Sequence, residues 1–225
     1  MIIKKNNQAI FVYNKSTMYT PKQFVAKDQQ ELIDFMTQFS FATIVTAKHS
    51  FPVATHLPFA ISVRNEKVFL RSHFAKANPQ WKDITDGQVL VIFTEPHAYI
   101  SPKNYDKVQE VPTWNYFSVH AYGTTKLVTD DEGALQILED MILSYDVAYQ
   151  SQWEGLSQDY KLKMIKGIVA FEIEVNDLQA AKKMSQNKTV AEQERIITSL
   201  SESDHSSDKL MATYMKKNLD SSAEK

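Results

Sequence analysis

The sequence of 225 residues contains no cysteine. Disulfide bridges, thiolate metal sites and cysteine nucleophiles are therefore excluded. A chain without disulfides fits a reducing compartment, and we expect a cytoplasmic protein.

Glycine is also scarce, because only five occur, at positions 87, 123, 133, 155 and 167. None of them forms a G-x-G-x-x-G pattern or a Walker loop. If this protein binds a nucleotide or a phosphate, side chains must replace the usual glycine-rich backbone loop.

The chain has no apolar run near the length of a transmembrane helix. Its first segment lacks the features of a signal peptide, so we expect residues 1–17 to be a disordered N-terminal extension, with Met18 as the functional start. The net charge of −2 gives no overall attraction for nucleic acid. DNA binding would therefore have to rest on a local patch.

Periodicity predicts a mainly β protein, a β-barrel with peripheral α-helices. Many short apolar segments at a spacing of roughly ten residues favour a barrel or sandwich over a parallel α/β sheet. Strands are predicted over 42–47, 52–62, 67–72, 89–94, 97–101, 114–125 and 168–175, and helices over 28–38, 130–145, 158–166, 189–200 and 207–219. Pro58 predicts an edge, bend or bulge in the second strand.

This pattern divides the chain into three parts. Residues 1–17 precede the barrel, residues 18–180 form it with a helical insertion at about 130–166, and residues 181–225 form a C-terminal helical segment. In the strand over 114–125, apolar residues alternate with aromatic and polar ones, which predicts one inward and one outward face.

The segment 72–81 places a hydroxyl, an imidazole, an ammonium and an amide within seven residues, from Ser72, His73, Lys76 and Asn78. A phosphate dianion needs such donors where no glycine loop exists. The backbone N–H groups of a helical turn starting here could add to them. The alternative interpretation is an ordinary solvated loop.

Two further pairs of adjacent residues could bind a flat ring. Thr55 and His56 place polar groups in an otherwise apolar strand, where they could bond the edge of a ring; alternatively, His56 is a half-buried histidine satisfied by a neighbour. Trp114 and Asn115 could wall a ring and bond its edge. For Trp114, core packing or a dimer interface explains the sequence as well.

Other chemistries have no support in the residues. The six histidines show no metal-binding spacing, no G-x-S-x-G occurs, and we identify no catalytic residue. A helix pair near the C-terminus carries only a weak basic patch. Its best candidates for contacts with a DNA backbone are Lys209, Lys216 and Lys217.

Several strings occur in an order that resembles one family. They include H-x-A-K-A-N-P-Q-W from His73, H-A-Y-I-S-P from His97 and V-P-T-W-N-Y from Val111. Over roughly residues 18–200 the chain is similar to the PaiB-like FMN-binding negative transcriptional regulators.

This resemblance implies an FMN-binding split β-barrel, like that of pyridoxamine-phosphate oxidases. It implies a homodimer with FMN at the interface and a role in repressing sporulation and degradative-enzyme genes in bacilli. By analogy, Ser72 and Lys76 would lie at the FMN phosphate and Thr55 and His56 along the ring edge.

The sequence departs from the family pattern in places. Arg71 stands where the family has a small glycine, and Lys103-Asn104 replaces a Ser-Trp. Two alternatives to a regulator therefore stay open: an FMN-dependent oxidoreductase acting on a small molecule, and a split barrel that binds haem or another ligand.

Overall fold

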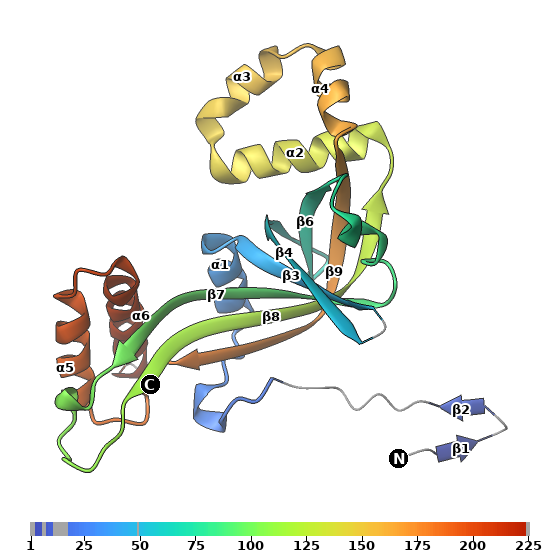
Figure 1. Ribbon diagram of the computed structural model, residues 1–225. Coiled ribbons are helices and arrows are strands. Elements are labelled where there is room, and N and C mark those ends of the chain that lie inside the picture. Colours follow the sequence, from blue (N-terminus) through green and yellow to red (C-terminus); the bar gives the residue numbers. More distant parts are fainter. Residues whose placement is uncertain (1–2, 6–7, 11–17, 49, 224–225) are drawn as a thin grey trace.

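The computed structural model describes residues 3–5, 8–10, 18–48 and 50–223 (Figure 1). Seven strands form one antiparallel sheet in the order β4-β3-β7-β8-β9-β6-β5. They are β3 (Phe41–Lys48), β4 (Phe51–Pro58), β5 (Ala60–Arg64), β6 (Lys67–Ala75), β7 (Gln88–Ile100), β8 (Thr113–Val128) and β9 (Ile168–Lys183). The sheet curls until β4 contacts β6, which gives a split β-barrel.

The barrel interior is filled by phenylalanine and aliphatic side chains. Five phenylalanines are almost completely buried, namely Phe59, Phe74, Phe93, Phe117 and Phe171. They come from alternate positions of their strands or from a strand end, as the pleat requires. The predicted inward face of β8 is confirmed, because Asn115, Phe117, Val119, Ala121 and Gly123 are all buried.

Two predicted strand boundaries were wrong. The segment 52–62 is two strands, β4 and β5, because the chain turns at Phe59, whose N–H donates to the carbonyl of Ser40 at 2.8 Å. Conversely, 89–94 and 97–101 are one strand, β7, with a register shift between Thr94 and His97. A proline can interrupt the apolar pattern without ending the strand when it lies in a bulge, where the regular pairing with the neighbouring strand is already broken.

Helix α1 (Gln29–Gln38) packs Phe35 and Met36 into the barrel core, and the Asp28 side chain caps its first turn. The predicted helix over 28–38 is thus confirmed. Between β6 and β7 the predicted helical turn is η2 (Pro79–Lys82), a single turn of 3-10 helix. Another 3-10 turn, η1 (Lys22–Phe24), precedes α1.

The predicted helical insertion follows β8. It consists of α2 (Asp131–Tyr145), η4 (Val147–Tyr149), α3 (Gln150–Gly155) and α4 (Gln158–Ile165). Its apolar side covers the side of β5, β6 and β9 that faces away from the barrel interior, and it forms a second, smaller core there. Figure 1 shows these helices at one end of the molecule.

The C-terminal helices lie at the other end, beside the far ends of β7 and β8 (Figure 1). They are α5 (Val190–Ser201), which begins with a capping box of Thr189 and Glu192, and α6 (Ser206–Ala223). Strand β9 continues to Lys183, past the predicted barrel boundary at residue 180. A short 3-10 turn, η3 (Pro102–Asn104), lies between β7 and β8.

Most of the predicted N-terminal extension falls outside the described residues. Within it, β1 (Ile3–Lys5) pairs with β2 (Gln8–Ile10). In the part of the chain that the structure describes, no helix has both the length and the apolar character needed to cross a membrane.

Candidate functional site

Thr55, predicted at the ring edge, and Asn78, predicted among the phosphate donors, are hydrogen-bonded to each other, and their polar groups are used within the chain. The side-chain oxygen of Asn78 caps η2, and its Nδ2 donates to Oγ1 of Thr55 at 2.9 Å. The Thr55 hydroxyl then donates to Oε1 of Gln80 at 2.6 Å. These bonds connect the turn after β6 to the edge strand β4.

Gln80 is the centre of this network, and the sequence did not single it out as a functional residue. Its side chain is buried, and Nε2 donates to the Val53 carbonyl at 3.0 Å and to Oγ1 of Thr46 at 3.2 Å. One amide therefore holds β3, β4 and η2 together. The only sequence signal was its place in the N-P-Q-W string directly after the capping Asn78.

His56 points to the other side of the sheet from Thr55. It is exposed, and its ring stacks near Phe41 with the ring centroids 6.4 Å apart. Adjacent residues of a strand face opposite ways, so these two predicted ring contacts cannot serve one ligand from the same face.

The residues predicted at a phosphate are also divided between two faces. Ser72 is completely buried, and its hydroxyl donates to the Pro58 carbonyl at 2.7 Å. His73 faces outward, and its Nδ1 is buried without a hydrogen-bond partner among the described residues. Burial lowers the pKa of His73.

Lys76 is the predicted phosphate ligand that stays available. Its backbone is fixed, because the Lys76 N–H donates to the Gly167 carbonyl at 2.8 Å and its own carbonyl accepts from Nε1 of Trp81 at 3.1 Å. Its ammonium group is exposed and forms no ion pair with a described residue. It borders a cavity of about 340 Å³ at the junction of β6, β9 and the insertion.

Arg71, one of the departures from the family pattern, lies under α2, on the side of β6 that faces away from the barrel interior. Its guanidinium pairs with Glu172 at 2.7 Å and with Asp140 of α2 at 2.5 Å, and Arg64 also pairs with Glu172 at 2.6 Å. Burial alone would raise the pKa of Glu172, but hydrogen bonds from the two arginines outweigh burial and lower that pKa. Arg71 thus attaches the insertion to the sheet.

Trp114 and Asn115 face opposite sides of β8. Asn115 is completely buried, and its Nδ2 donates to Oγ of Ser185 at 2.9 Å and lies 3.3 Å from Sδ of Met215 in α6. Its amide is part of the packing between β8 and the C-terminal helices. Trp114 is half exposed and packs edge-on against Tyr99, with centroids 6.0 Å apart.

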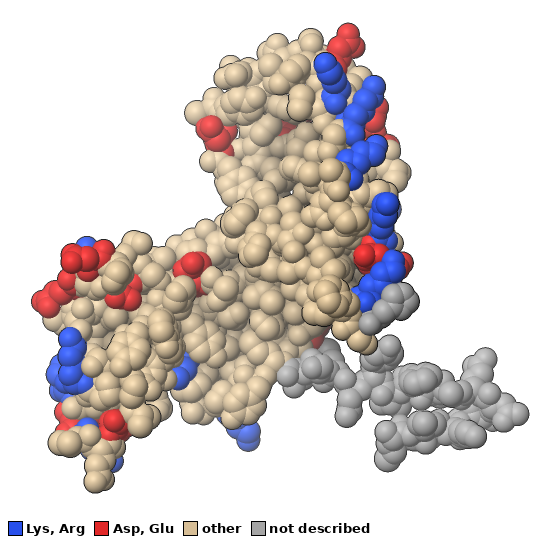
Figure 2. Space-filling model, in the orientation of Figure 1, with Lys and Arg blue, Asp and Glu red and all other residues tan. Residues whose placement is uncertain are grey.

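Trp114 belongs to an aromatic and apolar surface along the outer side of the sheet, which we call the outer face. Cross-strand pairs along β7 and β8 form it, and β3 and β4 extend it. Its members are Phe41, Thr43, Val45, Ala54, His56, Leu90, Ile92, His97, Tyr99, Trp114, Tyr116, His120 and Tyr122. Figure 2 shows that charged side chains gather mainly along the outer edges of the molecule, while the surface between the two helical regions carries few.

The three lysines predicted to contact DNA are all exposed on α6. Lys209 and Lys216, seven residues apart, share one side of the helix, whereas Lys217 is turned toward the groove beside α1. The connection between α5 and α6 is residues 202–205, which is shorter than the predicted linker. Asp208 and Asp220 on the same helix reduce the positive charge.

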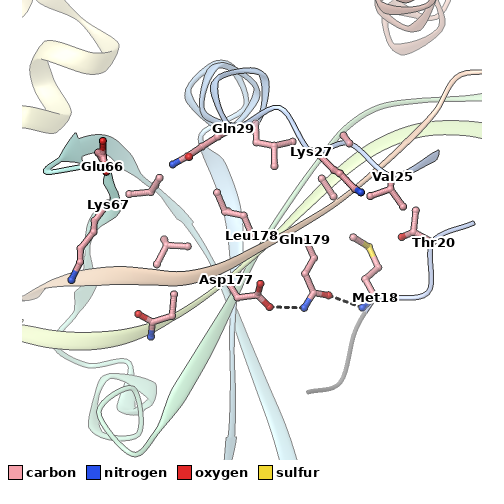
Figure 3. Close-up of a pocket in the computed structure, with 16 residues that line it drawn as sticks. Met18, Thr20, Val25, Lys27, Gln29, Glu66, Lys67, Asp177, Leu178 and Gln179 are labelled. Carbon is pink, nitrogen blue, oxygen red and sulfur yellow. Dashed lines mark hydrogen bonds between the residues drawn. The ribbon is translucent and has the colours of Figure 1, made fainter. Parts of the chain in front are cut away.

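A second cavity contains none of these residues. It has a volume of about 630 Å³ and lies at one end of the barrel, between the start of α1, the β5–β6 turn and the middle of β9 (Figure 3). The described residues contain no group of three histidine and carboxylate side chains that could hold a metal ion.

Comparison with known proteins identifies the family. Residues 18–177 match the family model described as "Putative FMN-binding domain". The chain is 38% identical over 205 residues to the "Protease synthase and sporulation protein PAI 2" of Bacillus subtilis, covering 90% of this chain and 98% of the relative.

Solved structures agree on the fold. The FAD and heme binding protein from Mycobacterium smegmatis superposes with a TM-score of 0.58 at 16% identity, covering 75% of this chain and 78% of that one. The flavocytochrome Anf3 from Azotobacter vinelandii gives a TM-score of 0.56 at 15% identity, covering 72% and 70%. The chain therefore has the fold of flavin-binding split barrels and belongs to the FMN-binding domain family that includes the PAI 2 protein.

Proposed function

We propose that this protein binds FMN between two copies of the chain and acts as a flavin-dependent regulator of transcription. The observation that carries the proposal is the outer face, because a surface of aromatic and aliphatic side chains this large is unusual on a monomer. Phe41 is 68% exposed and Trp114 is 54% exposed in the single chain. A second copy packed on this face would bury both side chains.

A slot between two such faces suits the isoalloxazine ring. The ring is flat and largely apolar, and aromatic walls bind such groups well. His56 on β4 supplies a polar group within the outer face, next to Phe41. We expect Thr55, Ser72 and Asn115 to act through packing, since their polar groups already have partners.

The phosphate of FMN would be bound by Lys76, with His73 near it on the same strand end. The ammonium of Lys76 is free of ion pairs with the described residues and is held on a fixed backbone. A charge-assisted bond to a phosphate dianion is the contact that this arrangement favours. The protein supplies binding and orientation, and the flavin supplies any redox chemistry.

The regulatory part of the proposal rests on the similarity to PAI 2, whose name refers to protease synthesis and sporulation. Lys209, Lys216 and Lys217 are the candidates for a DNA contact. Titration of DNA at two salt concentrations tests this, because binding through phosphates weakens steeply with salt. Absence of a salt-dependent complex would mean that control acts through a partner protein.

An FMN-dependent oxidoreductase is the second candidate, and haem binding is the third. The haem alternative draws support from two structural neighbours, the FAD and heme binding protein and the flavocytochrome. The absorbance spectrum of freshly purified protein distinguishes the candidates. Flavin bands support FMN, bleaching by NAD(P)H supports the enzyme, and a Soret band supports haem.

A further inference from the structure

The cavity at the end of the barrel, which we call the barrel-end cavity, has the size of a small-molecule site. Its volume of about 630 Å³ lies within the range of ligand pockets, about 300–1,000 Å³. It is separate from the outer-face aromatics and from Lys76. Its wall beside β9 is the segment that leads into α1, where the Met18 N–H donates to Oε1 of Gln179 at 2.6 Å (Figure 3).

A β-bulge shapes this cavity. Tyr122 of β8 pairs with Asp177 of β9, but the next residue, Gly123, pairs with Val175, so Asn176 is the extra residue. The bulge interrupts the alternation of β9, and both Val175 and Leu178 line the cavity as a result. Bulges of this kind often lie beside binding sites, where they redirect side chains.

The floor of the barrel-end cavity is apolar, and its rim carries charges of both signs. Leu32, Val68 and Leu178 contribute to the floor. The side chains of Lys27 and Glu66 form no hydrogen bond or ion pair with the described part of the chain, whereas Lys67 is paired with Glu174 at 2.5 Å. Figure 3 shows Glu66 at one end of the lining and Lys27 toward the other, with the amide of Gln29 between them.

We propose that the barrel-end cavity binds a short apolar peptide with free termini. The peptide ammonium would pair with Glu66, its carboxylate would pair with Lys27, and its side chains would cover the apolar floor. A single amino acid fits less well, because its ammonium and carboxylate groups are attached to the same carbon atom, whereas Glu66 and Lys27 lie toward opposite ends of the lining (Figure 3). The Gln29 amide can bond a peptide group between the two termini.

Calorimetric titration of the full chain with trileucine tests this proposal. We expect saturable binding, and acetylation of the peptide amine should weaken it about two- to fivefold, the worth of an exposed ion pair. In Glu66→Gln, acetylation should make no difference. Likewise, amidation of the peptide carboxylate should weaken binding to the wild type by a similar factor, and it should make no difference in Lys27→Gln.

A blocking variant provides a second test on the same helix. Gln29 lines the barrel-end cavity, whereas its neighbour Gln30 lines the groove on the other side of α1. Gln29→Trp should abolish trileucine binding, and Gln30→Trp should leave it unchanged. Both residues are exposed, so both variants should keep the wild-type melting temperature.

Two results would overturn the proposal: no binding of trileucine at millimolar concentration, or equal binding by the two tryptophan variants. An acetylation effect of the same size in Glu66→Gln and in wild type would reject the assigned orientation. Flavin binding is measured separately by absorbance, so the failure of one proposal leaves the other intact.

Discussion

Among single residues, Lys76 carries the largest expected contribution to FMN binding. Lys76→Ala should weaken FMN binding by about 1.5–3 kcal/mol, because the variant loses a charge-assisted hydrogen bond to the phosphate. Lys163→Ala, which removes an exposed lysine of α4, is the matched control and should leave the affinity unchanged. Titration followed by quenching of flavin fluorescence measures both. Equal affinity for wild type and Lys76→Ala would remove Lys76 from the site.

His73 makes a prediction about pH. Burial lowers its pKa below the ordinary value of 6.5, so the folded chain binds fewer protons than the unfolded chain as the solution becomes acidic. This contribution to stability is present above the unfolded pKa and is lost as the pH falls below it. The free energy of unfolding in urea should therefore decrease between about pH 7 and pH 5.

His73→Gln should make this pH dependence shallower, because the neutral amide does not titrate. Burial also lowers the pKa of His120 on the outer face, so the slope should flatten further in the double variant with His120→Gln. A wild-type slope that persists in the double variant would assign the effect to other groups. If FMN and a second copy cover His120, the dimer should show the larger slope.

At the scale of secondary-structure elements, Gln80 holds the open edge of the barrel. Gln80→Ala leaves the carbonyl of Val53 and the hydroxyl of Thr46 without their partner. Loss of a buried amide with several bonds should destabilise the chain by about 2–4 kcal/mol. Urea unfolding measures this, and Gln150→Ala, at a solvent-accessible position on α3, should change stability by less than about 0.5 kcal/mol. Equal effects of the two substitutions would show that the Gln80 network contributes no stability.

Much of the element pattern could be predicted from the sequence, because burial on one side imposes a period of two on each strand. The alternation in β8 and the helical spacing in α1 were sufficient for this. Proline was ambiguous, since Pro58 ends a strand while Pro96 sits in a bulge within β7. Only the fold decides between these outcomes.

The candidate site was harder to predict, for a physical reason. Alternation shows which residues share a face, but whether a polar residue faces inward depends on a partner distant in sequence. Asn115 can be buried because it hydrogen-bonds to Ser185, which lies 70 residues later in the sequence. Ser72 can be buried because its hydroxyl donates a hydrogen bond to the Pro58 carbonyl. The burial of Gln80 could not be predicted for the same reason, since its side chain bonds to Thr46 and Val53.

For the whole molecule, we expect a dimer formed through the outer face. Phe41→Glu places a carboxylate where a second copy would pack, and it should raise the dimer dissociation constant about 30-fold, near 2 kcal/mol. Phe51→Glu is the matched control. Phe51 is similarly exposed, at 72%, but it lies at the tip of the β3–β4 hairpin and points to the opposite side of the sheet from Phe41. Sedimentation equilibrium measures both variants.

If Phe41→Glu and the control dissociate equally, the dimer does not use this part of the outer face. A monomer in the wild type at micromolar concentration would argue against pairing altogether. The helical insertion and the C-terminal helices lie at opposite ends of the barrel (Figure 1).

Binding of FMN between two copies of the chain is tested by measuring flavin absorbance and molar mass on one sample. FMN is titrated into flavin-free protein over a range of protein concentrations, and mass is followed by light scattering. We expect one FMN per chain, bound only as the mass reaches that of a dimer, with an affinity for FMN that rises with protein concentration. FMN bound at full occupancy to a monomer, or no FMN bound to a stable dimer, would contradict it.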